Sequence, residues 1–291
     1  MATRTTHARA APRAGNRAAP GGEPLEDLEL RLLLEAVWTW YGYDFRDYAP
    51  SSVRRRVRFF MQDEGLPTVS SVQARILHDT AALGRFLRGL SVPVTAMFRD
   101  PAFYRVLREA VVPVLRTYPV VRVWHAGCST GEEVYSVAIL LREEGLYDRC
   151  RLYATDMNEA VLRQAQRGEL PLATMRDNTR NYIEAGGRQA FAQWYSVRDD
   201  RAVLDPELRQ NMVFSQHNLA TDGSFNEFNV VLCRNVLIYF NRALQDRVHR
   251  LLYESLIRLG FLGLGAKETV RFTPHEAHYE ELPERVYRKV G

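Results

Sequence analysis

The second half of the chain alternates segments typical of β-strands with segments typical of helices, and this alternation is what most constrains the fold. VRVWH at 121–125 is followed by a loop of small residues and a helix over 131–144. A second strand at 151–155 leads into a helix that begins after Asn158 and ends at Gly168. Because helices separate the strands, we expect a doubly wound, mostly parallel sheet of the Rossmann-like α/β class.

Three further apolar segments, at 212–215, 229–233 and 261–265, are predicted to add strands to this sheet. The stretch 169–211 interrupts the alternation because it is long, polar and aromatic, with glycines and a proline as breaks. We therefore expect a small subdomain inserted into the α/β domain.

The N-terminal part divides into segments of different composition. Residues 1–24 are rich in Arg, Ala, Pro and Gly, which cannot bury enough apolar surface to become ordered, so we predict a disordered tail. A transit peptide is the alternative, but the tail lacks an amphipathic helical pattern. Residues 25–90 have helical periodicity and predict a small all-helical domain. Residues 91–100 are then a linker that contributes to the active site, before the α/β domain at 101–291.

The start of the α/β domain has the signals of a helix. Asp100 is predicted to be the N-cap and Pro101 the first residue of this helix, which runs toward residue 118. Pro113 lies inside it, and we expect this residue to kink or divide the helix.

Composition excludes several classes of protein. The net charge of +4 over 291 residues does not by itself indicate nucleic-acid binding. Cys128, Cys150 and Cys233 lie far apart without metal-ligand spacing, so we expect neither disulfides nor a metal site. No apolar run reaches the roughly 18 residues of a membrane span, and the N-terminus lacks the apolar core of a secretory signal. We expect a cytoplasmic monomer that does not insert into membranes.

The first strand-to-helix turn, HAGCSTGEE at 125–133, has small residues that let a ligand approach the backbone. Its glycines would equally serve close helix packing, and the departure from G-x-G-x-x-G argues against a dinucleotide. The next strand ends at Asp156, where a carboxylate can bind ribose hydroxyls or cap the following helix. Together the turn and the acid fit S-adenosylmethionine, a nucleoside that carries a carboxylate and no phosphate.

The segment CRNVLIYF at 233–240 follows another predicted strand. Arg234, Asn235 and Tyr239 therefore fall at the edge of the sheet where ligands bind in such folds. The apolar residues between them are also compatible with a core segment in which Tyr239 is a half-buried aromatic.

Several ordered motifs resemble the CheR-type chemotaxis methyltransferases, from about residue 25 to the C-terminus. The motifs are TAMFRDPAFY at 95–104, STGEEVYS at 129–136, ATD at 154–156, HNL at 217–219 and CRNVLIYF at 233–240. The resemblance implies methyl transfer from S-adenosylmethionine to glutamate side chains on helices of a chemoreceptor-like protein, with S-adenosylhomocysteine as the second product. It also implies that Arg99 and Tyr239 flank the transferred methyl group as the catalytic residues.

The residues that the resemblance places around the cofactor are Thr95, Arg99, Glu133, Asp156, Asn218, Leu219, Arg234 and Asn235.

The chain also departs from the family pattern. Pro93 stands where some relatives have an asparagine, Met97 replaces a usual phenylalanine, and Val134 replaces a usual proline. AKE at 266–268 replaces a common His-Ser-Glu. The alternative function is therefore a catalytically weak, S-adenosylmethionine-binding regulatory or interaction protein of the same fold. A nucleic-acid amino-methyltransferase is disfavoured, because the Asn-Pro-Pro-Tyr-like segment of such enzymes is missing.

A helix predicted over 51–65 carries a cluster of arginines. On a helical wheel Arg54, Arg55 and Arg58 project opposite the apolar face, and Arg56 lies on the flank. Such a cluster is often no more than a solvated surface. Because receptor helices methylated by this family are rich in glutamate, we predict that these four arginines bind the substrate.

Overall fold

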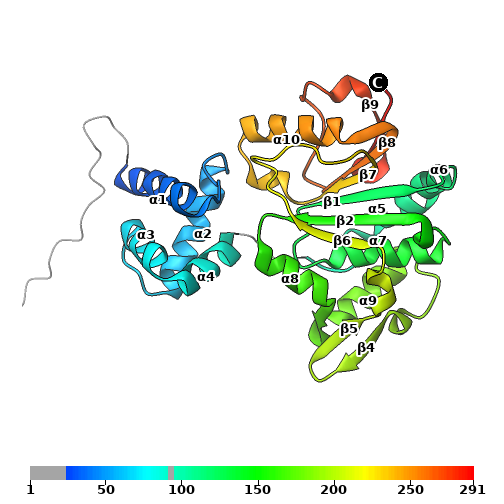
Figure 1. Cartoon of the computed structure of the whole chain (residues 1–291), viewed down its shortest axis with the longest axis horizontal. Helices are drawn as coiled ribbons and strands as arrows, with labels where there is room; N and C mark the ends of the chain where they lie inside the picture. Colours follow the sequence, from blue (N-terminus) through cyan, green and yellow to red (C-terminus); the bar gives the residue numbers. More distant parts are fainter. Residues whose placement is uncertain (1–23, 91–94) are drawn as a thin grey trace, which may run out of the picture.

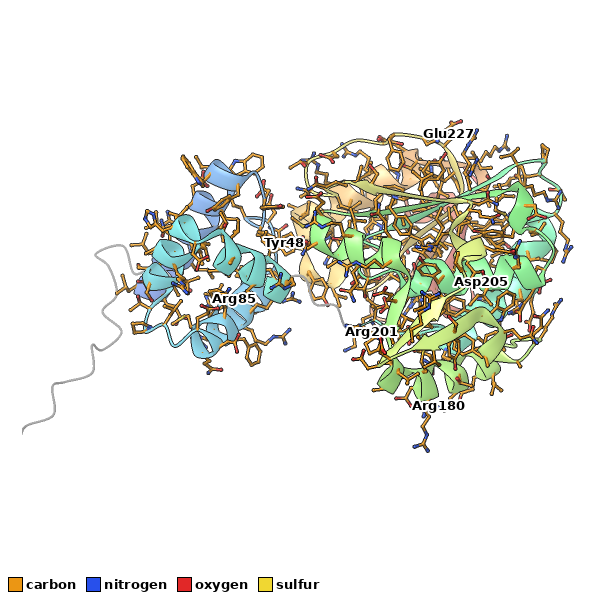
Figure 2. The ribbon with its side chains drawn as sticks, turned by 60° about the horizontal axis from the view of Figure 1, so that its bottom comes forward. Tyr48, Arg85, Arg180, Arg201, Asp205 and Glu227 are labelled. Atoms are coloured by element: carbon orange, nitrogen blue, oxygen red, sulfur yellow. The ribbon has the colours of Figure 1, made fainter. Side chains whose placement is uncertain are left out.

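The computed structural model describes residues 24–90 and 95–291, which form a small helical domain and a larger α/β domain (Figure 1). The predicted disordered tail lies, except for Pro24, outside the described residues, and so does Pro93. The helical domain meets the α/β domain around Tyr48, which forms a β-bridge with Phe240 (Figure 2). The amide of Ala49 also donates to the carbonyl of Tyr239 at 2.8 Å.

Within residues 24–90, local sequence signals set the helix ends. The helices are α1 (Leu25–Tyr41), α2 (Pro50–Asp63), α3 (Val69–His78) and α4 (Thr80–Leu90). Gly42 ends α1 in a left-handed conformation, and Thr68 forms a capping box with Ser71 at the start of α3. The predicted helical domain is confirmed.

The main sheet has the strand order β6-β2-β1-β7-β8-β10-β9. Its strands are β1 (Val121–Ala126), β2 (Cys150–Asp156), β6 (Met212–Gln216), β7 (Phe228–Cys233), β8 (Leu256–Leu264), β9 (Tyr279–Leu282) and β10 (Val286–Lys289). Neighbours from β6 to β8 pair in parallel, whereas β10 and β9 add antiparallel. The predicted mostly parallel sheet is confirmed. Strand β8 begins earlier than the predicted residue 261, because its pairing with β7 continues across an irregularity.

Helices cover both faces of this sheet (Figure 1). α7 (Glu132–Glu143) and α8 (Glu159–Arg167) lie on one face, and α10 (Arg242–Glu254) lies on the other. Along β7, Val230 and Leu232 join the core under α7, while Val231 and Cys233 join the core under α10. This two-sided burial explains why β7 is apolar throughout.

The interrupting stretch forms the inserted subdomain that was predicted. Its strands β3 (Glu169–Pro171), β4 (Tyr195–Arg198) and β5 (Arg201–Leu204) make an antiparallel sheet of order β3-β5-β4, accompanied by helix α9 (Met175–Glu184). Asn178 in α9 accepts a hydrogen bond from the amide of Met97 at 3.1 Å, and Asn181 donates to the carbonyl of Met97 at 3.1 Å. The subdomain thus fixes the backbone just before Arg99.

The helix after Asp100 differs in part from the prediction. It runs as α5 (Pro101–Val106), a π-helical turn (Leu107–Val111) and α6 (Val112–Leu115), so the helix is divided next to Pro113 as expected. Asp100 takes the predicted N-cap position and Pro101 begins the helix, but the side chain of Asp100 makes no capping hydrogen bond. Its carboxylate instead pairs with Arg234 at 2.8 Å, because that buried guanidinium requires acceptors.

Candidate functional site

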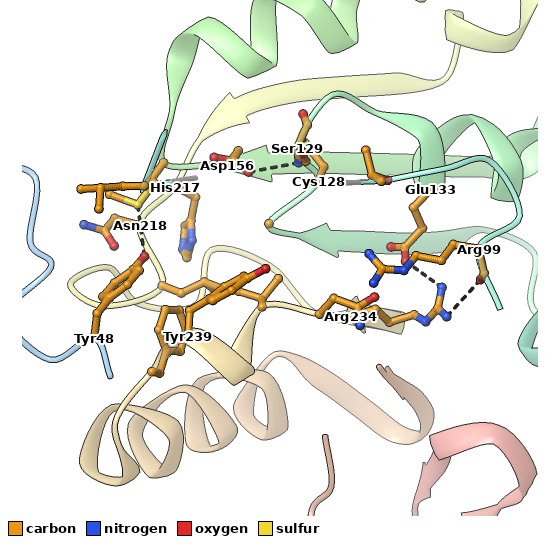
Figure 3. A pocket seen from close by; sticks show the side chains of 18 of the residues that line it. Tyr48, Arg99, Cys128, Ser129, Glu133, Asp156, His217, Asn218, Arg234 and Tyr239 are labelled. Carbon is orange, nitrogen blue, oxygen red and sulfur yellow. Dashed lines mark hydrogen bonds and ion pairs between the residues drawn. The ribbon is translucent and has the colours of Figure 1, made fainter. Parts of the chain in front are cut away.

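A pocket lies at the carboxyl ends of the parallel strands, and Phe45 and Tyr48 of the helical domain complete its wall (Figure 3). It encloses about 1090 Å³, counting the open space at its mouth. Sequence-predicted residues from every motif line it: Thr95, Arg99, Glu133, Asp156, Asn218, Leu219, Arg234, Asn235 and Tyr239. Folding therefore brings together all the predicted catalytic and cofactor-binding positions.

The first strand-to-helix turn has the close backbone approach that its glycines suggested. Gly127 has φ +78°, and a Cβ atom there would lie 2.7 Å from Cγ2 of Val236. Gly131, at φ +96°, begins α7. Because other side chains are disfavoured in both places, the glycines set the course of this turn, and Gly127 lines the pocket.

Asp156 lies at the end of β2 and holds this turn. Its carboxylate accepts hydrogen bonds from the amides of Ser129 at 3.0 Å and Asn158 at 2.9 Å. Burial raises the pKa of Asp156 above its ordinary value. Asn158 is the N-cap of α8, since its side chain accepts from the amide of Ala160. Asp156 thus faces the pocket at the position where folds of this kind bind ribose.

Glu133, in the first turn of α7, is a partly buried carboxylate with partners on both oxygens. Oε1 lies 3.0 Å from Nδ1 of His125, and Oε2 lies 3.2 Å from Nη1 of Arg234. Burial by itself raises the pKa of Glu133, but the hydrogen bond from His125 and the charge of Arg234 outweigh it, and the pKa is lowered. An anionic carboxylate here suits the ammonium group of an amino acid ligand.

Arg234 holds this side of the pocket together. Its guanidinium pairs with Glu133 and Asp100, donates to the carbonyl of Arg99 at 3.2 Å, and lies 4.0 Å from the ring centroid of Phe103. With its side chain only 2% exposed, Arg234 contacts mainly other protein groups. We infer that it orders Glu133 and the Arg99 backbone.

The predicted catalytic residues Arg99 and Tyr239 both line the pocket. Figure 3 shows Arg99 beside Glu133 and Arg234, Tyr48 and Asn218 on the opposite side, and Tyr239 between the two groups. Arg99 lies between two residues in the left-handed region, Phe98 at φ 51° and Asp100 at φ 58°. Such strain persists only where the surroundings enforce it, which here are the contacts of the inserted subdomain and Arg234.

Glu268 is a site residue that the sequence interpretation missed. It lies in the segment that departs from the family pattern, is 4% exposed, and accepts backbone hydrogen bonds from Gly265, Asn235 and Ile238 at 2.6, 2.9 and 3.3 Å. Burial raises the pKa of its carboxyl group. Glu268 therefore fixes the loop that carries Asn235 and Tyr239. The available signal was an acidic residue in the loop that follows the apolar strand β8.

The four arginines of α2 do not share one exposed face. Arg55 is exposed, whereas Arg54 pairs with Asp27 of α1, and Arg58 pairs with Glu26 of α1 at 2.8 Å. Arg54, Arg55 and Arg58 line a shallow surface depression.

Arg56, which was predicted on the flank of the helix, is buried. The residue is 6% exposed, and its guanidinium carbon lies 4.4 Å from the ring centroid of Tyr239. The reason is the α/β domain, which covers this flank of α2.

Other kinds of site receive no support from the described part of the chain. Over residues 24–90 and 95–291, no cluster of His, Cys, Asp and Glu is arranged to hold a metal ion. No helix in these ranges is both long and apolar enough to cross a bilayer. Cys128, Cys150 and Cys233 are buried free thiols, and burial raises their pKa values, so they are not activated nucleophiles.

The Rossmann-like sheet, its glycine turn and the acids at the ends of β2 and in α7 define an S-adenosylmethionine-dependent methyltransferase fold. The chain belongs to the CheR methyltransferase family: the family's S-adenosylmethionine-binding domain matches residues 93–287, and its all-alpha domain matches residues 28–91.

Three relatives illustrate this membership. A Pseudomonas putida protein that bears the name methyltransferase Cher3 is 49% identical over 265 residues, covering 90% of this chain and 97% of that protein. A chemotaxis protein methyltransferase of Listeria innocua is 30% identical over 231 residues, covering 79% of this chain and 85% of its own. An uncharacterized 104.1 kDa protein of Rhodobacter capsulatus is 32% identical, covering 86% of this chain but only 26% of that larger protein.

Proposed function

We propose that the protein is a protein-glutamate O-methyltransferase that uses S-adenosylmethionine to esterify glutamate side chains on helices of a chemoreceptor-like protein. The observation that carries the proposal is the joint position of Arg99 and Tyr239 on one pocket with Glu133 and Asp156. We further propose that it acts in the cytoplasm, as a monomer, in chemotaxis or chemotaxis-like signalling.

The pocket residues fit the methyl donor by their chemistry. Asp156 accepts hydrogen bonds and suits ribose hydroxyls, while the anionic Glu133 suits an α-ammonium group. Thr95, Asn218, Leu219 and Asn235 line the same cavity. When bound, S-adenosylmethionine supplies a methyl group on a sulfonium, an electrophile that the protein itself lacks.

The acceptor needs little acid or base assistance. A glutamate side chain has an ordinary pKa of about 4.3, so it is already a nucleophilic anion at neutral pH. The protein's contribution is then positioning and exclusion of water, and effective molarity can supply on the order of 7 to 11 kcal/mol of the barrier. Arg99 is suited to orient the anion or the cofactor, and the Tyr239 hydroxyl is suited to donate to the attacking carboxylate.

The exposed arginines of α2 are the surface we propose for the protein substrate. Arg54, Arg55 and Arg58 line one depression on the helical domain, beside the exposed Phe59. A helix with glutamates and apolar residues on one side is complementary to this combination of charge and aromatic surface.

Two measurements test the proposal. Titration calorimetry must show binding of S-adenosylmethionine and S-adenosylhomocysteine. Transfer of a tritiated methyl group to candidate receptors must then release volatile methanol in base, because an ester is alkali-labile and an N-methyl group is not. Cofactor binding without transfer to any carboxylate would instead support the alternative, a regulatory protein of this fold.

A further inference from the structure

Tyr104, in α5, carries a buried hydroxyl group that the protein itself does not satisfy. The residue is 0% exposed, and its oxygen has no hydrogen-bond partner of normal geometry among the described residues. The hydroxyl of Ser136 acts on it, but that group already donates to the carbonyl of Glu132 at 2.6 Å and accepts from the amide of Phe98 at 2.9 Å. A buried hydroxyl without a partner is unfavourable, because it has lost its hydrogen bonds to water and gained none in return.

Aromatic neighbours hold the ring of Tyr104 in place. Its centroid lies 5.0 Å from that of Phe98 in a tilted contact and 5.5 Å from that of Phe103 in an edge-to-face contact. All three rings belong to the core of the α/β domain, so the hydroxyl cannot turn toward solvent without breaking this packing. The position of the hydroxyl is therefore set before any ligand binds.

Tyr104 also lines the pocket on which the predicted cofactor-binding positions converge. The charges of Arg234, Glu133 and Asp100 act on its hydroxyl, and the guanidinium carbon of Arg234 lies 5.8 Å from its ring centroid. Tyr104 thus belongs to the end of the pocket where Figure 3 shows Arg99, Glu133 and Arg234.

The neighbours of this hydroxyl define the ligand group that it suits. Glu133 is an anion at the same end of the pocket and suits the α-ammonium group of the methyl donor. The α-carboxylate of that amino acid is attached to the same carbon atom, so it lies beside the ammonium group and requires hydrogen-bond donors. Burial raises the pKa of Tyr104, so its hydroxyl stays protonated and is available as a donor. Hydrogen bonds from such a donor are strongest when the acceptor is an anion.

We infer that Tyr104 is a cofactor-binding residue whose hydroxyl donates a hydrogen bond to the α-carboxylate of the methyl donor. The inference rests on the proposed binding of S-adenosylmethionine in this pocket and deepens that part of the proposed function. It does not depend on which acceptor is methylated. The hydroxyl destabilises the free protein and gains its partner when the donor binds.

The test compares Tyr104→Phe with the wild-type protein, because this change removes the hydroxyl and keeps the ring. The probes are S-adenosylmethionine and its decarboxylated form, which lacks the α-carboxylate but keeps the ammonium group and the sulfonium. Calorimetry should show that Tyr104→Phe weakens binding of the intact donor about ten- to hundredfold, the size of a lost hydrogen bond to a charged group. Binding of the decarboxylated donor should be weaker than that of the intact donor in the wild type, and Tyr104→Phe should change it by less than about twofold.

Urea unfolding of the ligand-free proteins gives a second readout with the opposite sign. The free energy of unfolding of Tyr104→Phe should equal or exceed the wild-type value, because a buried hydroxyl without a partner is removed. Tyr147→Phe is the matched control. Tyr147 is also buried, but its hydroxyl donates to the carbonyl of Leu208 and accepts from the amide of Asn211 at 3.3 Å. This control should lower the free energy of unfolding and leave donor affinity unchanged.

Specific results overturn the inference. Equal affinity of Tyr104→Phe and the wild type for S-adenosylmethionine would remove the hydroxyl from cofactor binding. Equal losses of affinity for the intact and decarboxylated donors would show that the hydroxyl does not act on the carboxylate. A lower free energy of unfolding in ligand-free Tyr104→Phe would show that the hydroxyl has a partner inside the protein. Failure of the wild-type protein to bind either donor would contradict the proposed function itself.

Discussion

The two walls of the pocket differ in how their charges are compensated. On the α/β wall, Glu133 shares its oxygens between His125 and Arg234, and Arg234 also pairs with Asp100. On the wall from the helical domain, Arg56 has enclosed nitrogen atoms without acceptors. The charges of the first wall are paired within the protein, whereas the buried guanidinium of the second wall lies against the ring of Tyr239 and has no carboxylate partner among the described residues. The order of the α/β wall therefore comes from ion pairs within one domain, whereas the order of the helical wall depends on how the two domains meet.

The largest expected effect comes from removing Arg99 between these walls. Arg99→Ala should lower methyl transfer by about 10²- to 10³-fold, the cost of losing a charged group that acts on the reacting atoms. Tyr239→Phe should lose less, about tenfold, because only one hydrogen bond disappears. Both are measured as kcat with tritiated donor. Thermal unfolding should stay near the wild-type midpoint, because Arg99 lines the pocket and Tyr239→Phe keeps the ring that packs against the core.

Arg180→Ala is the matched control for this pair. Arg180 projects from α9 into solvent, with a 63% exposed side chain (Figure 2). It should keep wild-type rates. Wild-type rates in Arg99→Ala and Tyr239→Phe as well would refute their assignment.

The next largest expected effect comes from removing the charge of Glu133 on the α/β wall. Glu133→Gln should weaken S-adenosylhomocysteine binding by about a hundredfold, because the ammonium partner is lost and Arg234 keeps only Asp100. Calorimetry at neutral pH gives the value.

The lowered pKa of Glu133 also gives a sign for the pH dependence of stability. An acid with a lowered pKa in the folded protein stabilises it fully above the ordinary value of about 4.3, and this contribution disappears as pH falls through the lower folded value. Urea unfolding of wild type against Glu133→Gln should therefore show a gap at neutral pH that narrows in acid. A gap that widens in acid would contradict the assignment of charge.

Much of the α/β wall was predictable because its residues follow strands. Asp156 and Arg234 each come directly after an apolar segment, and parallel strands bring such positions to one edge of the sheet. The glycine turn could be predicted equally well from the sequence, since Gly127 and Gly131 occupy left-handed conformations that few other residues tolerate.

The helical-domain wall was not predictable in the same way. A helical wheel placed Arg56 on the flank of α2, but only the position of the other domain decides whether a flank is buried. His125 and Glu268 were missed for a related reason. His125 contacts Glu133, and Glu268 binds the backbone of a loop, and the periodicity of a sequence does not predict contacts of this kind. Likewise, the acids that pair with Arg54 and Arg58 lie on α1, far from them in the sequence.

Glu268 bears on both walls of the pocket, because it orders the loop that carries Asn235 and Tyr239. Glu268→Gln replaces one accepting oxygen by an amide that faces backbone N–H groups, so we expect kcat to fall about tenfold from a displaced Tyr239. Cofactor affinity should change less than kcat, because Glu133 and Asp156 are held by other contacts. A change confined to cofactor affinity would show that the loop serves the donor side instead.

The smallest expected effect concerns the outer face of α2. Arg55 has no acidic partner among the described residues, whereas Arg58 pairs with Glu26. Reversal to glutamate should therefore raise the KM for a protein acceptor more at Arg55 than at Arg58, each by only a few fold, about the size of exposed charge effects. Both effects should shrink as salt is raised to about 0.5 M, because exposed charges are screened. Steady-state kinetics at two salt concentrations measures the contrast, with donor affinity as the control. If the effect of Arg55→Glu on KM did not change with salt, it would not come from an exposed charge, and Arg55 would be removed from the proposed substrate surface.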